Sequence, residues 1–197
     1  MQMLPKEFVL TNLEEKGRLQ FFYHSPSSEL PVRDVLNEQG RDHKTEPHIE
    51  IGAENFINPC YQKNNIVPFL KSREKYLFLF TTCKSEKLKD YLNRRFIVGY
   101  IIKQKIINCG DHYAVQGKTK LYTFEDAYPL EILFPSTYRN MRIRKLSKEE
   151  TRKVLNHFKT KRNILLECIN EIKRLDRKNL TCKGKNCRFR KECLRFR

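Results

Sequence analysis

The chain has 197 residues, of which 39% are hydrophobic and 11% aromatic, enough for one folded domain with an appendage. Charged residues reach 32% with only 7 glycines and 8 prolines, which excludes a collagen-like or fully disordered chain. The longest apolar runs hold about five or six residues, far short of the roughly 18 that a membrane span needs. The N-terminus MQMLPKEF lacks the basic and apolar regions of a secretory signal, so we expect a cytoplasmic protein without membrane contact.

The net charge of +17 is concentrated near the C-terminus. Residues 139–197 hold 21 Lys or Arg against 6 Asp or Glu, whereas residues 1–138 hold 19 against 17. Positive charge at this density attracts polyanions, because binding releases their counterions. We therefore expect the last part of the chain to contact nucleic acid. The alternatives are a solvated basic tail and a tail that binds an acidic protein or a membrane surface.

The first part of the chain predicts short strands and long connections. Residues 7–12 and 19–24 are aromatic or β-branched runs separated by EEKGR, which favours a hairpin with Gly17 in its turn. Residues 25–47 are polar and long for a connection inside a compact domain. Residues 55–70 contain two prolines, which favours an irregular, aromatic-rich loop over a strand.

The middle of the chain carries the clearest strand patterns. Residues 75–82 (KYLFLFTT) have the continuous hydrophobicity of a central strand, and a short helix is expected from Ser85. Residues 95–107 predict a long strand with a bulge or bend at Gly99.

A turn at residues 108–111 (NCGD), a strand with a glycine kink over 112–124 and a short strand over 130–134 complete the body. We expect an α+β fold in which residues 1–138 form a small mixed or antiparallel β-barrel, closed or half-closed, with a long irregular loop around 25–72. Such a barrel hides the edges of its sheet.

From residue 139 the hydrophobic period changes to that of a helix. Ser147 and Glu150 form a capping box, and apolar residues recur from Val154 to Leu175 with Lys and Arg on the other side. The pattern predicts one amphipathic helix of about 30 residues, or two shorter ones broken near Arg162 and Asn163. The apolar stripe should dock on the body, which leaves a basic outer face.

A cluster of cysteines at the C-terminus predicts a metal site. Cys182, Cys187 and Cys193 lie within twelve residues, among Lys, Arg and one glycine. Positive surroundings keep thiolates ionised, and a short glycine-containing loop lets several sulfurs converge on one ion. Zn²⁺ and a [4Fe–4S] cluster both suit this spacing, and both need four ligands in a closed site.

The fourth ligand of this site must come from elsewhere in the chain. Cys168 is the nearest candidate, with Cys60 and Cys109 as alternatives. Cys168 also falls on the apolar stripe of the predicted helix, where a buried free cysteine is ordinary.

A distal cysteine followed by a tight cluster of three resembles the iron–sulfur staple of RecB-family nucleases. The resemblance covers about 26 residues and implies that the cluster clips the C-terminus onto the domain. Those enzymes also need an Asp and a Glu-x-Lys pair on adjacent strands. The nearest counterpart here, Glu171-Ile-Lys173, lies in the predicted helix, so the resemblance implies a metal staple and not nuclease activity.

Two segments of the body are similar to PUA-like domains of the EVE, YTH and ASCH kind. Residues 76–82, the short helix and Phe96-Ile-Val-Gly-Tyr-Ile-Ile look like the opening β-α-β of these domains, and GRLQFFYHS (17–25) resembles the FYHS strand of EVE proteins, where that strand comes after the helix. The resemblance implies a barrel that holds one flipped base in an aromatic pocket. The pocket candidates are Tyr23, His24, Asn58, Tyr61, Tyr113 and Gln116, each with core packing as the alternative.

These patterns together predict a protein that binds nucleic acid, RNA or DNA. The body would recognise a base, including a modified one, and the tail would hold phosphates through Arg139, Arg142, Arg144, Lys145, Arg188, Arg190 and Arg195. No H-E-x-x-H, H-x-E or G-x-S-x-G pattern is present, so no catalytic residue is assigned. The alternatives are a nucleic-acid enzyme with a structural or redox cluster, and an adaptor in a viral or defence assembly whose tail binds a protein partner.

Overall fold

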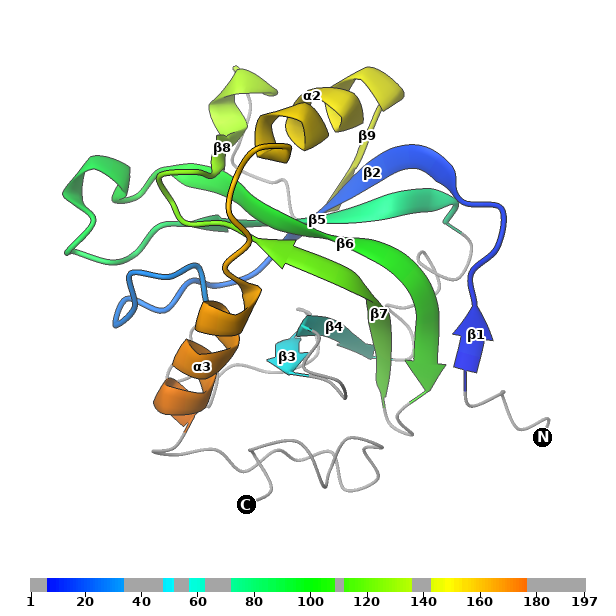
Figure 1. The fold of residues 1–197 in the computed structure, drawn as a ribbon, viewed down its shortest axis with the longest axis horizontal. Coiled ribbons are helices and arrows are strands. Elements are labelled where there is room, and N and C mark those ends of the chain that lie inside the picture. The colour runs from blue at the N-terminus through cyan, green and yellow to red at the C-terminus, as the bar shows by residue number, and fades with distance from the viewer. Residues whose placement is uncertain are drawn as a thin grey trace.

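The computed structural model describes residues 7–33, 48–51, 57–62, 72–108, 112–135 and 143–176. Over these residues the fold is α+β, with one strongly curved sheet that carries a helix on each face (Figure 1). The strands are β1 (Glu7–Val9), β2 (Glu14–Phe21), β3 (His48–Ile51), β4 (Ile57–Gln62), β5 (Glu74–Thr82), β6 (Arg95–Asn108), β7 (His112–Leu121), β8 (Tyr128–Pro129) and β9 (Ile143–Leu146). The helices are the 3-10 turns η3 (Lys89–Tyr91) and η4 (Leu130–Ile132) and the α-helices α2 (Lys148–Phe158) and α3 (Leu165–Asp176).

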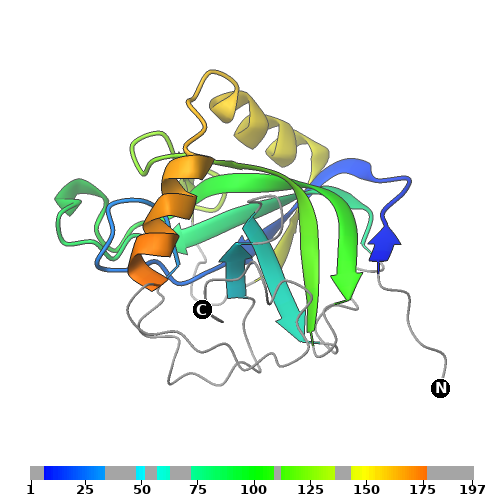
Figure 2. The ribbon, with the colours of Figure 1, turned by 60° about the horizontal axis from the view of Figure 1, so that its bottom comes forward.

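The sheet is mixed, and its order is β3-β4-β7-β6-β5-β2-β9, with β1 and β8 also paired to β6. Only β2 and β5 run parallel among the described pairs. The end strands β3 and β9 do not pair with each other over the described residues, so the sheet is open there (Figure 2). The α+β class is therefore confirmed. β9, which comes from the segment assigned to the tail, is a strand of the same sheet as the body.

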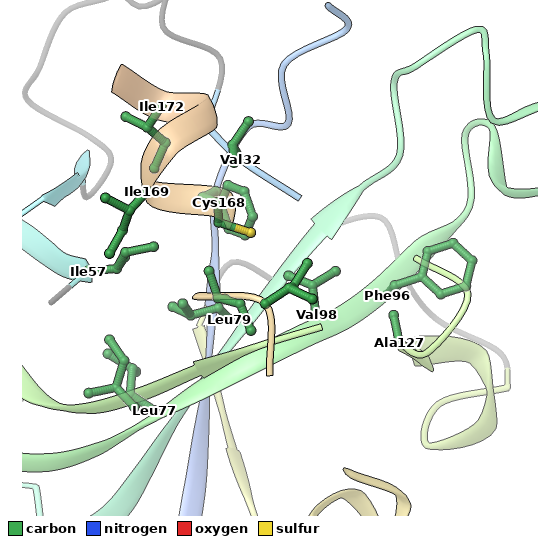
Figure 3. Packing of buried hydrophobic residues seen from close by; sticks show 14 of the residues in the cluster. Val32, Ile57, Leu77, Leu79, Phe96, Val98, Ala127, Cys168, Ile169 and Ile172 are labelled. Atoms are coloured by element: carbon green, nitrogen blue, oxygen red, sulfur yellow. The ribbon is translucent and has the colours of Figure 1, made fainter. Parts of the chain in front are cut away.

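Two hydrophobic clusters occupy the two faces of this sheet. Along β5, Leu77 and Leu79 belong to one cluster and Phe78 and Phe80 to the other, as the alternation of side chains in a strand requires. The first cluster is completed by α3, whose Cys168, Ile169 and Ile172 point toward the sheet (Figure 3). The second is completed by α2.

α2 is held on its face of the sheet by aromatic stacking. The Phe158 ring lies parallel to the Tyr122 ring, with centroids 4.1 Å apart and an interplanar angle of 5°. At the other end of the helix the predicted capping box is confirmed: the Glu150 amide donates to Ser147 Oγ at 3.1 Å, and the Ser147 amide donates to a Glu150 carboxylate oxygen at 2.7 Å.

The tail contains two helices, α2 and α3, and not one long helix. This confirms the alternative with a break near Arg162 and Asn163. The break is fixed by Asn163, whose side-chain oxygen accepts from the amides of Leu121 and Leu165. The Ile164 amide also donates to the Leu121 carbonyl at 2.9 Å. The linker thus bonds to the last residue of β7 while it carries the chain from one face of the sheet to the other.

The predicted N-terminal hairpin is wrong. β1 pairs with β6, and the EEKGR segment lies inside β2, which runs between β5 and β9. Gly17 is needed there for packing and not for a turn, because a Cβ atom at this position would overlap the Phe78 ring.

Several expected boundaries also differ from the structure. β4 falls within the segment expected to be a loop. Pro59 lies opposite Ile49 of β3, and its β7 side has no register partner because the described pairing of β4 with β7 starts only at Cys60. The helix expected from Ser85 is reduced to the single turn η3, and residues 130–132 form η4 and not a strand.

The two predicted glycine irregularities are present in the sheet. Next to Gly99, Val98 is the extra residue of a bulge in β6 opposite β5. Opposite Gly117 the extra residue is Gln104, so the second bulge lies in β6 and not in β7.

Candidate functional site

A cluster of buried polar side chains crosses three adjacent strands of the sheet. Arg18 on β2, Glu74 on β5, Lys103 on β6 and Ser72 just before β5 are each less than a tenth exposed. Arg18 Nη2 donates to Glu74 Oε1 at 3.3 Å, and Lys103 Nζ donates to Ser72 Oγ at 2.8 Å. Charged groups are rarely buried this deeply unless they are paired or functional.

Glu74 is held in its ionised form. Burial alone would raise the pKa of its carboxyl group, but hydrogen bonds from its own backbone amide and from Ser72, with the charges of Arg18 and Lys145, lower that pKa overall. Lys145 Nζ lies 3.4 Å from Glu74 Oε1 and reaches it from the surface.

Lys103 is the unusual member of the cluster. It is 3% exposed, and burial lowers the pKa of its ammonium group to about 8, with Glu74 opposing and Arg18 reinforcing the shift. An ammonium group has three N–H donors. Within the described part of the chain, Ser72 Oγ is its one hydrogen-bond acceptor, and no carboxylate oxygen lies within 4 Å of Nζ. Two donors of a buried cation are therefore unused.

A cavity of about 280 Å³ opens beside this cluster, where β9, β2 and the start of β5 lie side by side. Its walls carry charged or polar groups, apart from one leucine: Glu14, Lys16, Ser72, Arg73, Glu74, Lys145 and Leu146. Lys16 pairs with Glu14 at 2.7 Å. Arg73 is exposed and forms no ion pair with any residue that the structure describes. We call this cavity the cationic pocket.

Three exposed cations continue the positive surface along α2, from its first residue to the residue after its end. Lys148, Arg152 and Lys159 are exposed, and their spacing of four and seven residues puts them on one side of the helix. None of the three forms an ion pair among the described residues. The pKa of Glu14 is lowered mainly by its hydrogen bond with Lys16 and further by the charges of Arg73 and Lys148, so Lys148 lies within electrostatic reach of the pocket.

Two of the predicted phosphate-binding residues belong to this surface. Arg144 and Lys145 are exposed on β9, and the Arg144 guanidinium lies over the Phe134 ring at 3.9 Å. The others lie outside the described residues: Arg139, Arg142, Arg188, Arg190 and Arg195. Sequence reasoning missed Lys16 and Arg73, because nothing local indicates that they meet β9.

His24, predicted for the base pocket, has both ring nitrogens engaged by the fold. Nδ1 accepts from the Lys84 amide at 2.9 Å, so Nε2 carries the proton and donates to the Leu30 carbonyl at 2.9 Å. The ring is 2% exposed and stands edge-on to Phe124. These contacts match the core alternative. Its neighbour Tyr23 is half-buried against the edge of Phe21.

The remaining base-pocket candidates lie in another part of the sheet. Tyr113 and Gln116 are buried on β7, and Tyr113 is the register partner of Tyr61 on β4, the strand that also contains Asn58. β5 and β6 separate β7 from β2, which leads to His24. The structure therefore gathers the six candidates into two groups.

Cys168, predicted as the fourth metal ligand, lies in the hydrophobic cluster under α3 (Figure 3). Burial raises the pKa of its thiol, and the charges of Glu167 and Glu171 add to the shift, which disfavours the thiolate that a metal requires. Cys182, Cys187, Cys193 and Cys109 lie outside the described residues, as does the side chain of Cys60. Over the described ranges, no three His, Cys, Asp or Glu side chains are arranged to hold a metal ion.

Comparisons with protein-family models, with curated proteins and with solved structures found no match. None of the helices in the described part of the chain is both long enough and apolar enough to cross a bilayer.

Proposed function

We propose that this protein binds nucleic acid through the positive surface formed by the cationic pocket, β9 and α2. The observation that carries the proposal is the row of exposed cations Lys148, Arg152 and Lys159 along α2, which starts near the pocket with Lys148 and forms no ion pair with a described carboxylate. Three other cations of the tail are paired within the fold: Lys161 with Asp126, Arg162 with Glu167 and Arg174 with Glu171.

The physical basis is the release of counterions from phosphates. Each Lys or Arg that contacts a phosphate displaces condensed cations, which makes binding favourable and steeply dependent on salt. Unpaired cations contribute more than paired ones, because they lose no intramolecular partner when the polyanion arrives. The strongly basic segment beyond α3, with Arg188, Arg190 and Arg195, would add further phosphate contacts.

In this proposal the curved sheet corresponds to a PUA-like barrel, and the body recognises a single base. The two segments that carry the resemblance support it: residues 17–21 and 76–80, far apart in sequence, lie in register on the parallel strands β2 and β5. The three C-terminal cysteines would bind Zn²⁺ or an iron–sulfur cluster and fix the basic end of the chain.

Fluorescence anisotropy with labelled 20-mers of RNA and DNA, at 50 to 300 mM salt, tests this proposal. A triple variant, K148Q/R152Q/K159Q, should weaken binding at least tenfold and reduce the salt slope by about 2, since each phosphate contact contributes roughly 0.7 to 0.9. A control that removes the same charge elsewhere, K118Q/R162Q/R174Q, should bind like the wild type.

Two results would contradict the proposal. Binding that ignores salt would exclude phosphate recognition, and equal losses in the two triple variants would exclude the α2 surface as its location. The same oligonucleotides, incubated with Mg²⁺ and resolved by size, separate binding from cleavage. Shortened products would favour the enzyme alternative.

A further inference from the structure

The unused donors of Lys103 are the starting point for a more specific assignment. Lys103 is buried, yet its ammonium group has Ser72 as its one described partner, and two N–H groups remain without an acceptor. Leaving such donors unsatisfied away from water is costly. Ser72 lines the cationic pocket, so this buried charge stands directly behind the pocket wall.

The charges around the pocket do not balance. Glu14 and Glu74 are the carboxylates of its wall, and each already has a cation within 3.5 Å. Arg73 and Lys103 are left without a carboxylate among the described residues. A bound anion would give Arg73 a partner in the pocket, and it would also be attracted by the charge of Lys103 behind Ser72.

The chemistry of the wall indicates which kind of anion fits. The described lining contains no aromatic ring, so a base could not be stacked there. The volume of about 280 Å³ is near the lower end for ligand pockets, which suits a compact charged group. Arg and Lys side chains, of which Arg73 and Lys145 line this pocket, are groups that bind phosphate oxygens in proteins.

We propose that the cationic pocket binds the terminal phosphate monoester of a nucleic-acid strand. A monoester carries a charge of about −1.5 to −2 at pH 7. This charge neutralises Arg73 and Lys103 more fully than the single charge of a phosphodiester does. The end of a strand can also enter a walled pocket, whereas an internal phosphate has chain on both sides. This inference rests on the proposed function.

Each pocket residue has a distinct part in this assignment. Arg73 and Lys145 reach the phosphate from the rim, and Ser72 lies at the wall nearest to the buried cluster. Lys103 is a positioning residue: it supplies positive charge from behind the wall and holds Ser72, whose hydroxyl hydrogen-bonds Glu74 and so keeps this carboxylate in place. Arg18 keeps Glu74 neutralised, so that this carboxylate does not repel the ligand.

The test compares labelled 12-mers that carry a 5′-phosphate, a 3′-phosphate or hydroxyl groups at both ends, in phosphate-free buffer. The wild type should bind one of the phosphorylated forms at least tenfold more tightly than the hydroxyl form. Inorganic phosphate should compete with that form and raise the melting temperature of the protein.

Three variants locate the preference. R73Q and S72A should each reduce the ratio of affinities for phosphorylated and hydroxyl strands to about one. Arg73 is exposed, so R73Q should fold, and thermal melting followed by circular dichroism checks the folding of both variants. R152Q should weaken all strands alike and keep the ratio. R162Q, which removes the same group far from the pocket, should change neither.

The outcomes separate the two proposals. Equal binding of all three strands by the wild type, or a ratio unchanged in R73Q, overturns the terminal-phosphate assignment, while a steep salt slope would still support the proposed function. If inorganic phosphate binds in an Arg73-dependent manner and no strand binds, the nucleic-acid assignment is overturned together with the proposed function, and the pocket is a site for a free phosphate.

Discussion

The protonation of the buried Lys103 ammonium group makes the stability of the fold depend on pH. Its pKa falls from an ordinary value of 10.5 to about 8 in the folded state, because burial disfavours the charged form. Between about pH 8 and pH 10 the unfolded chain binds one more proton than the folded chain at this residue. Raising the pH in this window therefore favours the folded state, by about 1.4 kcal/mol for each pH unit.

K103M should remove this contribution. We expect the free energy of unfolding of the wild type, minus that of the variant, to increase by about 2 kcal/mol between pH 8 and pH 9.5. Urea unfolding at intervals of half a pH unit measures it. Burial raises the pKa of the Cys83 and Cys168 thiols, which opposes the trend in both proteins and cancels in the difference. Parallel curves for the two proteins would refute a lowered pKa at Lys103.

The metal content of C168A and C187S decides whether Cys168 is a core residue or a metal ligand. Its burial and the raised pKa of its thiol favour the core. We expect C168A to lower the free energy of unfolding by about 1 to 2 kcal/mol through lost packing, and to keep whatever zinc or iron the wild type binds. C187S should lose that metal with little change in the stability of the sheet.

Metal analysis and a visible absorption spectrum on anaerobically purified protein measure the metal content of both variants. Loss of metal from C168A would establish Cys168 as the fourth ligand. It would also require the thiol to leave the cluster under α3.

At the level of elements, the aromatic contacts of Phe158 are the main packing of the C-terminal end of α2. Phe158 is buried and stacked on Tyr122. Its ring also packs near that of Tyr100, with the two ring centroids 6.1 Å apart. We expect F158A to cost about 3 to 5 kcal/mol, because it leaves a cavity between the helix and the sheet. Urea unfolding followed by circular dichroism measures the loss.

L166A is the matched control for that change. Leu166 lies on α3 with 66% of its surface exposed, so its truncation should alter stability by less than about 0.5 kcal/mol. Similar losses in the two variants would mean that the stacking of Phe158 does not hold α2 in place.

The elements that the sequence predicted well are those with strong local signals. Continuous hydrophobicity located β5 and most of β6, and the capping box located the start of α2. The break between α2 and α3 was predicted as one of two alternatives, because the run from Val154 to Leu175 keeps its helical period across the break. Only the bonds of Asn163 to β7 and α3 decide between them.

Elements whose neighbours are distant in sequence could not be predicted in the same way. The EEKGR segment has the composition of a turn, but β2 continues through it because β5 and β9 pair on both sides. Likewise, Pro59 marks a loop in isolation, yet β3 and β7 provide partners for β4. In both cases tertiary pairing outweighs local preference.

At the level of the whole molecule, the cationic pocket joins three segments that the chain keeps far apart. Its walls come from residues 14–16, 72–74 and 145–146, which meet only because β2 lies between β5 and β9. Composition located positive charge in the tail but not Arg73, Lys16 or the buried Lys103. The sequence could therefore indicate polyanion binding, whereas the pocket itself required the sheet.

The position of β2 also governs when the protein can fold during synthesis. β2 is among the first strands to leave the ribosome, but its neighbours in the sheet are made much later. Leu19 of β2, for example, lies opposite Phe78 of β5 and Arg144 of β9. The β9 side of β2 therefore stays unpaired until most of the chain has been made, at about 5 to 20 residues per second. The strand waits several seconds for this partner, with the charged side chains of Glu14, Glu15 and Lys16 protecting its open edge, and no shortened product that ends before β9 can form the pocket.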